Sequence, residues 1–292
     1  MTTVDRVIPR RRRTSSERFW RLFRTAPPTA SIGMVVVFAY VVVAILAPLI
    51  APYGESEVIA EPFAPWSQQA VFGTDQLGRD VLTRLIHGAR NTIGIAVAAT
   101  LLAFLIGGGL GLLAAIRRGW LDELTGRAVD VLMAIPSLIF ALMLLAIFGS
   151  SILNIILIIA VLDATRVFRL TRAVALDVVV MDYIEGARLR GEGLGWIMRR
   201  EILPNIMPPL AAEFGLRFCY VFLTISSLSF LGVGIQPPLA DWGSMVRENA
   251  VLITYGDITP LLPAGAIALL TVAVNFVVDW FLHKSSGLRD DV

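Results

Sequence analysis

The chain has 292 residues, of which 56% are hydrophobic and only 16% are charged, and its net charge is +2. Soluble domains are typically about 45–50% apolar and about 25% charged, so a water-soluble globular domain and a disordered chain are both excluded. The small net charge gives no indication of a surface that binds nucleic acid. The apolar residues lie in blocks of about 20, close to the length that a helix needs to cross a bilayer.

The first 29 residues are polar and basic, and they carry eight arginines before the Pro27-Pro28 pair. The apolar run that follows, Ile32–Ala51, is longer than the about 7–15 residues of a signal-peptide core, and no convincing cleavage site follows it. We therefore interpret residues 1–29 as a basic tail and residues 30–52 as an uncleaved first transmembrane helix.

Five further apolar segments follow, so the sequence predicts an all-α membrane protein with six transmembrane helices. The second span contains Gly107 and Gly111, whose spacing favours close helix contact. The third contains Pro136, which a membrane helix tolerates when neighbours satisfy the freed carbonyl group. The fourth is short, with residues on either side available to extend it, and the fifth starts with Pro208-Pro209. Spans two to six cover approximately Thr92–Ile116, Val129–Phe148, Ile152–Thr165, Pro208–Leu231 and Leu261–Leu282.

The basic residues predict the orientation of these spans. Twenty of the 25 lie on one predicted face, in the N-terminal tail, the loops 117–128 and 166–204, and the tail 283–292. Basic residues accumulate in cytoplasmic segments, so we expect both termini to be cytoplasmic. The segments 53–91 and 232–259 are then external loops.

Signatures of enzymes are scarce. His87 and His283 are far apart and have no histidine or cysteine nearby, so no zinc site of ordinary spacing is present. The only lysine, Lys284, follows His283, so the Gly-Lys of a nucleotide-binding P-loop is missing. We therefore predict a chain that is not an enzyme and binds no cofactor or metal itself. The single cysteine, Cys219, lies in an apolar run and is interpreted as a packing residue.

The long cytoplasmic loop 166–204 carries the most informative pattern. Connections of this length are uncommon unless they serve a function. Apolar positions such as Ile184 and Ala187 alternate with charges, Gly191 then breaks the helix, and a second short helix is expected to end at Pro204. Two short helices joined at a glycine form an elbow that can seat in a groove on a soluble partner. The alternative is an amphipathic segment lying among lipid headgroups.

This segment resembles the EAA loop of ABC importer permeases, which reads E-A-A, three residues, G, a spacer and then I-x-L-P. The chain departs from the pattern in having Gly186 for the middle alanine and Glu201 where the isoleucine falls. The resemblance implies that the loop couples the chain to an ATPase, through an acid for polar contact, an alanine for close approach and a glycine for the corner. The residues implied are Glu185, Gly186, Ala187, Gly191, Leu203 and Pro204.

The predicted external loop contains a second motif, made of Gly73, Thr74, Asp75, Gly78, Arg79 and Asp80. By themselves these residues, and Gly88-Ala89-Arg90 after them, indicate turns at a membrane surface, with Trp66 and Trp242 as interfacial anchors. Together with Ala47–Tyr53 and Leu228–Pro238 they resemble the second permease subunit of the dipeptide/oligopeptide/nickel permease family. The resemblance covers nearly the whole chain from about residue 28. The C-terminus departs from it, because Trp280–Ser286 intervene before Gly287-Leu288-Arg289-Asp290.

The resemblance implies a type I ABC importer permease fold, in which residues 92–282 form the permease core. The chain would be half of a translocation channel in a bacterial or archaeal cytoplasmic (inner) membrane. The implied partners are a homologous permease subunit, two ABC ATPase subunits that use ATP and Mg, and an external solute-binding protein, periplasmic or lipid-anchored. The implied solute is a dipeptide, an oligopeptide or a related small molecule such as a nickel chelate, glutathione or an opine.

Four ionisable residues fall in or near the predicted spans: Asp163, Glu213, Arg217 and Asp279. A charge at the bilayer centre costs about 2.5–3.5 kcal/mol on insertion scales, so such groups usually face the protein interior and pair. Glu213 and Arg217 have the four-residue spacing of a helical ion pair. We interpret this pair either as a structural clamp or as part of the lining of the solute path.

The main alternative function is an ATP-independent secondary transporter or channel, which has no need to dock the loop 166–204 on a partner. A third class, an intramembrane enzyme, is disfavoured because the sequence offers no nucleophile–base pair.

Overall fold

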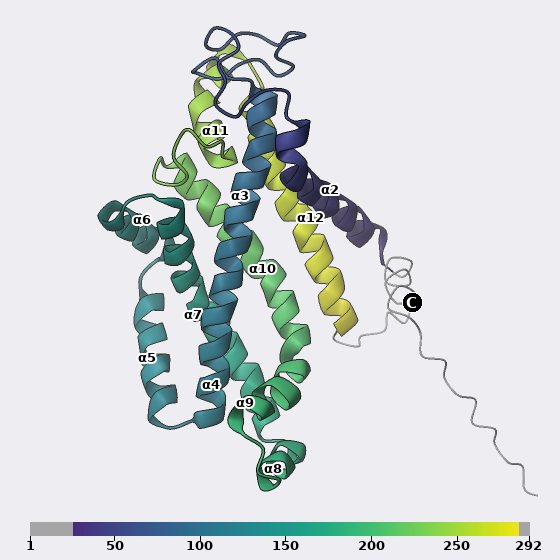
Figure 1. Ribbon diagram of the computed structural model, residues 1–292, viewed down its shortest axis with the longest axis vertical. Helices are drawn as coiled ribbons and strands as arrows, with labels where there is room; N and C mark the ends of the chain where they lie inside the picture. Colours follow the sequence, from purple (N-terminus) through teal and green to yellow (C-terminus); the bar gives the residue numbers. More distant parts are fainter. Residues whose placement is uncertain (1–25, 286–292) are drawn as a thin grey trace, which may run out of the picture.

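The computed structural model describes residues 26–285, and within this range the chain is helical, with two isolated β-bridges and no strand. The long helices run between two ends of an elongated bundle (Figure 1), which we name the α11 end and the α8 end after the short helices found there. The helical elements are α2 (Pro28–Ile50), α3 (Val81–Ala103), η1 (Phe104–Gly108), α4 (Gly109–Arg117), α5 (Trp120–Ala134), α6 (Ser137–Phe148), α7 (Ile152–Val179), α8 (Asp182–Leu189), α9 (Leu194–Ile197), η2 (Met198–Ile202), α10 (Leu203–Phe230), α11 (Trp242–Asn249), η3 (Ala250–Tyr255) and α12 (Leu261–Ser285).

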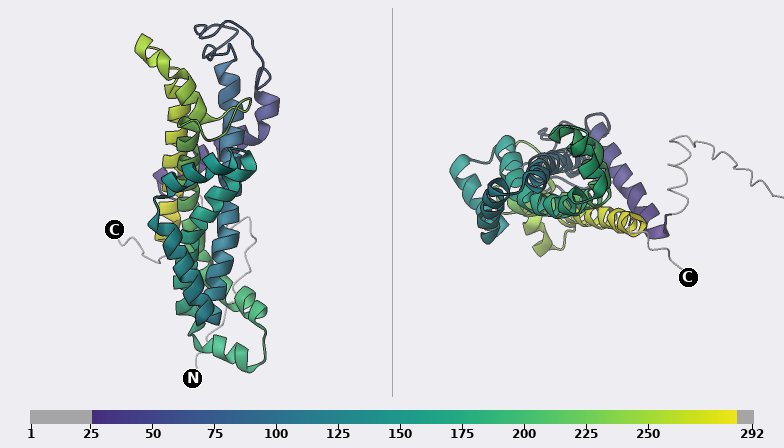
Figure 2. Two further views of the ribbon diagram at one scale, coloured as in Figure 1. Left: turned by 90° about the vertical axis from the view of Figure 1, so that its left-hand side faces the viewer. Right: turned by 90° about the horizontal axis from the view of Figure 1, so that it is seen from below.

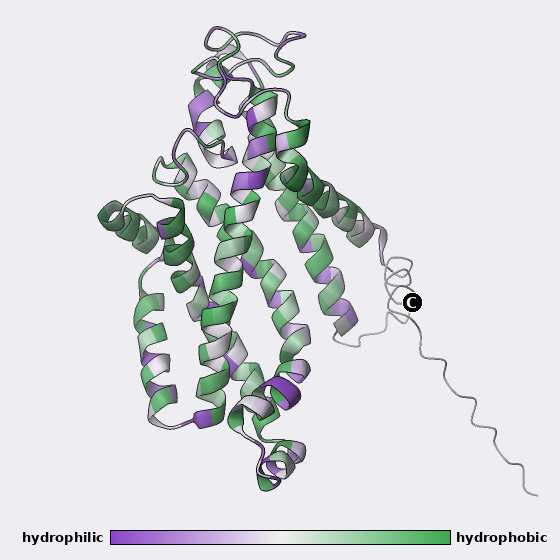
Figure 3. Cartoon of the chain, viewed as in Figure 1, coloured by the Kyte–Doolittle hydropathy of each residue, from purple (hydrophilic) through white to green (hydrophobic). Residues whose placement is uncertain are grey.

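Four helical segments of the described chain are long and apolar enough to cross a membrane, and five if the bent pair α5 and α6 forms one span. Apolar residues accordingly dominate the long helices (Figure 3). Helix α7 has 28 residues but is not among these segments, because Asp163, Arg166 and Arg169 all lie in its first 18 residues. The chain is therefore a helical, multi-pass membrane protein in which one long helix carries unusual charge.

The first and last spans agree closely with α2 and α12. The basic tail 1–29 and the C-terminal tail 283–292, including the divergent Gly287-Leu288-Arg289-Asp290, fall mostly outside the described residues.

The second span begins earlier than predicted. Asp80 caps α3, because its Oδ2 accepts a hydrogen bond from the Thr83 N–H at 2.7 Å. The cap satisfies a free N–H of the first turn, and no helix breaker follows it, so α3 starts at Val81. The expected turn at Gly88-Ala89-Arg90 is therefore wrong, since these residues lie inside the helix.

The third span is not one helix that tolerates Pro136. Helices α5 and α6 meet there at 90°. Ile135 is extended, with φ −93° and ψ 132°, because the proline ring disfavours helical geometry in the residue before it.

The fourth and fifth spans are longer than predicted. Helix α7 continues to Val179, so the predicted loop 166–204 begins as helix. Pro204 does not end the second short helix, because α9, the π-helical η2 and α10 form one continuous segment, Leu194–Phe230. A proline is tolerated in a first helical turn, where its missing N–H has no intrahelical partner. Pro208 and Pro209 lie inside α10, past its first turn, so the predicted start of the fifth span at this pair is wrong.

Close helix packing at the two predicted glycines is confirmed. A Cβ on Gly111 would lie 2.8 Å from the Phe168 carbonyl oxygen, and one on Gly107 would meet that of Ala164. Both contacts bring η1 and α4 against α7. Cys219 is buried in the main apolar cluster, as predicted for a packing residue.

Candidate functional site

Helices α8 and α9 form an elbow, residues 182–197, beyond the lower ends of the long helices (Figures 1 and 2). Gly191 has a φ of +82°, the left-handed region that glycine adopts without steric cost. Its N–H donates to the Arg188 carbonyl at 2.9 Å, and the Glu192 N–H donates to the Ala187 carbonyl at 3.2 Å. These two bonds are the Schellman pattern that ends a helix. The predicted glycine corner is confirmed.

The inner face of the elbow is fixed in the chain's own second apolar cluster. Ile184, Ala187 and Ile197 are almost fully buried in it. The cluster takes its other buried members from α4, α7, η2 and α10: Leu112, Ala115, Ile116, Ala175, Val179, Ile202, Ile206 and Leu210. Ala187 therefore faces inward, and the elbow packs directly on α4, α7 and α10.

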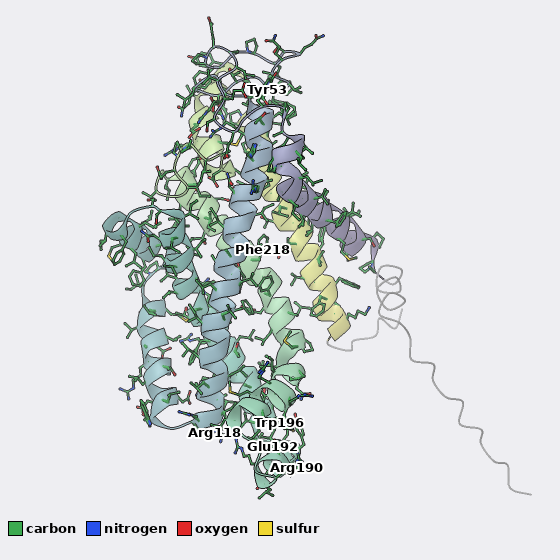
Figure 4. The ribbon with its side chains drawn as sticks, in the orientation of Figure 1. Tyr53, Arg118, Arg190, Glu192, Trp196 and Phe218 are labelled. Carbon is green, nitrogen blue, oxygen red and sulfur yellow. The ribbon has the colours of Figure 1, made fainter. Side chains whose placement is uncertain are left out.

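The outer face of the elbow is uncovered. Leu189 is 84% exposed, and Glu185, Arg188 and Trp196 are exposed beside it. Figure 4 places Arg190, Glu192 and Trp196 at the tip of the bundle. An exposed surface that mixes apolar and charged side chains is typical of a protein interaction site.

The remaining residues of the predicted coupling loop fit the same element. A Cβ on Gly186 would have no neighbour closer than Arg190 Nη1 at 3.9 Å, so the departure from alanine there costs no packing. Leu203 packs on the second cluster, and Pro204 lies exposed in the first turn of α10. Glu185 through Gly191 form α8 and its cap, whereas Leu203 and Pro204 belong to α10.

At the opposite end lies a buried group of four charges, Asp75, Arg79, Arg84 and Glu248, which we name the α11-end cluster. Arg79 Nε is 2.7 Å and Arg84 Nε is 3.2 Å from Asp75 Oδ2. Both arginines also approach Glu248 Oε2, at 3.5 and 3.6 Å. All four side chains are at least nine-tenths buried. The cluster joins the segment before α3 to α3 itself and to α11.

The other residues of the predicted external motif fold the segment before α3. Gly73 and Gly78 have φ values of +72° and +76°, as expected for turns. The Thr74 hydroxyl donates to the Glu61 carbonyl at 2.6 Å, and Asp80 caps α3. Sequence reasoning missed Arg84 and Glu248. The position of Arg84 among mostly apolar neighbours, four residues after Asp80, was the available signal.

Trp242 is not an interfacial anchor, because it is only 2% exposed. Its Nε1 donates to the Leu85 carbonyl at 2.9 Å, and its ring lies where a Cβ on Gly88 would be. The neighbouring Asp241 accepts hydrogen bonds at 2.9 Å from the Ser244 N–H and the Thr92 hydroxyl. Burial raises the pKa of the Asp241 carboxyl, and these hydrogen bonds oppose that shift. Helix α11 is therefore docked on α3.

The second predicted interfacial residue, Trp66, is half exposed, and its Nε1 donates a hydrogen bond to Thr259 Oγ1 at 3.1 Å.

Three of the four predicted intramembrane charges converge between α7 and α10. The Glu213–Arg217 ion pair is confirmed, with Oε1 and Nε 2.7 Å apart. Arg217 Nη1 also lies 3.5 Å from Asp163 Oδ1. Arg166, which the sequence did not single out, adds a contact of 4.0 Å to the same oxygen. Asp279 lies apart, exposed on α12.

A cavity of about 440 Å³ lies between α5 and α7. Arg169 Nη2 is 2.5 Å from Asp130 Oδ1, and Arg172 pairs with both oxygens of Asp122, with Nη2 2.6 Å from Oδ2. Arg169 and Arg172 of α7 thus face α5, whereas Asp163 pairs with α10. Their three-residue spacing was the signal that sequence reasoning passed over. In the described part of the chain no cluster of histidine, cysteine or carboxylate side chains could hold a metal ion.

Residues 107–285 match the family described as the binding-protein-dependent transport system inner membrane component. Residues 16–71 match the N-terminal transmembrane domain of oligopeptide transport permease C. The crystal structure of an amino acid ABC transporter with histidines shares the fold, with a TM-score of 0.51 at 18% identity over 69% of this chain and 94% of that chain.

Two relatives cover almost the entire chain. The di/tripeptide transport system permease protein DppC of Pseudomonas aeruginosa (strain UCBPP-PA14) is 34% identical over 281 residues, 94% of this chain and 90% of that protein. The glutathione transport system permease protein GsiD of Escherichia coli O1:K1 / APEC is 35% identical over 297 residues, 99% of this chain and 94% of that protein.

The helical membrane fold and these matches define a transport permease rather than an enzyme. The chain belongs to the binding-protein-dependent inner membrane components, and among them to the ABC importer permeases of the dipeptide/oligopeptide type.

Proposed function

We propose that the chain is the permease subunit of an ATP-driven importer and forms half of a translocation channel for a peptide or a related small solute. The observation that carries the proposal is the elbow, which is anchored inside and uncovered outside. The names of the relatives, which include di/tripeptide and glutathione permeases, support a peptide-like solute.

The proposed topology has six spans, with both termini and the elbow on the cytoplasmic face of a bacterial or archaeal inner membrane. In Figure 1 successive segments run in alternating directions along the bundle, through α2, α3 with α4, α5 with α6, α7, α10 and α12, with α2 in the half nearer the α11 end and α5 in the half nearer the α8 end. Helix α2 starts and α12 finishes on the side away from the α11-end loops. Arg188, Arg190, Arg199 and Arg200 gather at the α8 end, which supports a cytoplasmic location for it.

The proposed partners follow from this topology. Two ATPase subunits bind ATP and Mg. One contacts the outer face of the elbow of this chain, and the other contacts the corresponding elbow of a homologous second permease subunit. An external binding protein delivers the solute at the α11 end. Closure of the ATPase pair displaces the elbow, and the second apolar cluster passes the movement to α4, α7 and α10.

An ATP-independent transporter or channel remains the alternative function. It leaves the uncovered outer face of the elbow without a role. Docking among lipid headgroups would suit Arg188 and Arg190 but place Glu185 beside an anionic surface of like charge, so cross-linking of the outer face of the elbow decides between a lipid and a protein partner.

The test is Gly191→Val in the complete importer, reconstituted in vesicles with its binding protein. A β-branched residue in the left-handed region is strained by about 1–2 kcal/mol, and relief of that strain opens the corner. We expect the solute imported per ATP hydrolysed to fall about tenfold, with a normal amount of assembled importer.

Gly256→Val is the matched control. Gly256 has φ +78°, no atom within 4 Å of the position that a Cβ would take, and the same pair of hydrogen bonds, from its own N–H and from that of Asp257. The control carries equal strain at the opposite end, so its ratio of uptake to hydrolysis should equal that of the wild type. An unchanged ratio in Gly191→Val would refute the coupling role of the elbow.

A further inference from the structure

Helix α7 carries four charges at three-residue spacing, Asp163, Arg166, Arg169 and Arg172, which form a stripe that winds from the side facing α10 to the side facing α5. Residues three apart are neighbours on a helix surface. A charge facing lipid at mid-bilayer is costly. The partners of Asp163, Arg169 and Arg172 lie on α10 and α5, and that of Arg166 is Asp163. The charged stripe of α7 therefore faces protein or water rather than hydrocarbon.

Arg166 differs from the other arginines of this region. Arg169, Arg172 and Arg217 each have a carboxylate oxygen within 2.7 Å. Among the described residues, the ion pair of Arg166 is the 4.0 Å contact with Asp163, and its side chain is 42% exposed. Its guanidinium therefore keeps donors available to a ligand, near the middle of a 28-residue helix.

A small cavity of about 30 Å³ adjoins Arg166 between α6, α7 and α10, and Ser137, Asp163, Tyr220 and Thr224 contribute polar groups to its lining. A space of this size holds about one water molecule or one oxygen of a carboxylate. Asp163 Oδ2 is buried there without a hydrogen-bond partner, and the Asp163 side chain is 8% exposed. A buried unpaired oxygen of this kind is costly unless a ligand or water satisfies it.

We propose that Arg166 and Asp163 bind a zwitterionic solute in the translocation path, Arg166 at its carboxylate and Asp163 at its ammonium group. A guanidinium binds a carboxylate through two parallel hydrogen bonds. One cation beside one carboxylate matches the two ends of a short peptide and leaves the charge of the region unchanged. The exposed side of Arg166 leaves room for the rest of the solute. The inference rests on the proposed function.

The test uses Arg166→Cys in a Cys219→Ala background, with the complete importer in vesicles and labelled dialanine or glutathione, whichever the wild type imports. Loss of the charge-assisted hydrogen bonds should lower uptake about tenfold at a normal level of assembled importer. A trimethylammonium-ethyl thiosulfonate should partly restore uptake, and its anionic sulfonate counterpart should not. The imported peptide should slow labelling of the cysteine, which a purely structural residue would not show.

Arg117→Cys, an exposed arginine in the last turn of α4, is the control and should show normal uptake and no protection. Wild-type uptake by Arg166→Cys, or labelling that the peptide does not slow, overturns the inference. If that variant does not assemble, Arg166→Lys replaces it: a raised KM for uptake at unchanged ATPase rate supports the site, and an unchanged KM refutes it. If the wild-type importer shows no ATP-dependent uptake of any dipeptide, tripeptide or glutathione, the peptide-like solute of the proposed function fails instead.

Discussion

The α11-end cluster and the charged stripe of α7 contain the same chemistry in opposite settings. Each combines arginines with carboxylates in a chain that is only 16% charged. In the α11-end cluster every side chain is at least nine-tenths buried, whereas Arg166, Arg169 and Arg172 of α7 are between 37% and 54% exposed beside two cavities. The enclosed cluster holds elements together, whereas on α7 the more distant pairing of Arg166 leaves its guanidinium open to a ligand.

The enclosed cluster joins distant parts of the chain. Arg79 and Glu248 are 169 positions apart, and Trp242, docked on Gly88, makes a second link between the same helices. The α11-end cluster therefore holds α11 on α3.

Arg84→Gln should have the largest effect, because it removes one cation from the α11-end cluster. Removing one cation leaves buried negative charge at Asp75 and Glu248, which should cost about 3–5 kcal/mol. The melting temperature of the purified importer and its amount in the membrane should both fall sharply. Arg90→Gln, an exposed change on the same helix, should leave both unchanged. A wild-type melting temperature for Arg84→Gln would show that the cluster does not hold α11 on α3.

Glu213→Gln should have a smaller effect, because Glu213 and Arg217 are partly exposed. The single change leaves Asp163 opposite two arginines, and we expect a loss of about 1–2 kcal/mol. Glu213→Gln combined with Arg217→Gln restores the balance of charge and should recover most of that loss in a thermal unfolding measurement. Equal membrane levels and equal melting temperatures of the single and double variants would count against a clamp.

Features that depend on neighbouring residues were mostly predicted from the sequence, and features that depend on distant contacts were not. Apolar blocks located α2 and α12, and Gly191 located the corner of the elbow, because both depend on neighbouring residues. The bend at Pro136 and the start of α3 were misjudged, although Ile135 before the proline and Asp80 as a cap were local signals. The burial of Trp242 and the pairing of Arg84 with Glu248 depend on which helices meet, which a single sequence does not show.

Arg166 illustrates the same limit at the candidate site. Its spacing from Asp163, Arg169 and Arg172 is visible in the sequence. The sequence does not show that the Arg166 guanidinium is free to bind a ligand. That property depends on Asp130, Asp122 and Glu213, which pair with the other arginines from α5 and α10.

The central claim is that the outer face of the elbow seats in an ATPase, and cross-linking tests it most directly. In a Cys219→Ala background, Leu189→Cys places a thiol on the outer face and Ala187→Cys places one in the second apolar cluster, two residues away. With a short bifunctional maleimide in native membranes, we predict an ATPase-containing product for Leu189→Cys whose yield changes with ATP, and none for Ala187→Cys. Absence of that product from an assembled, active Leu189→Cys importer would contradict the account.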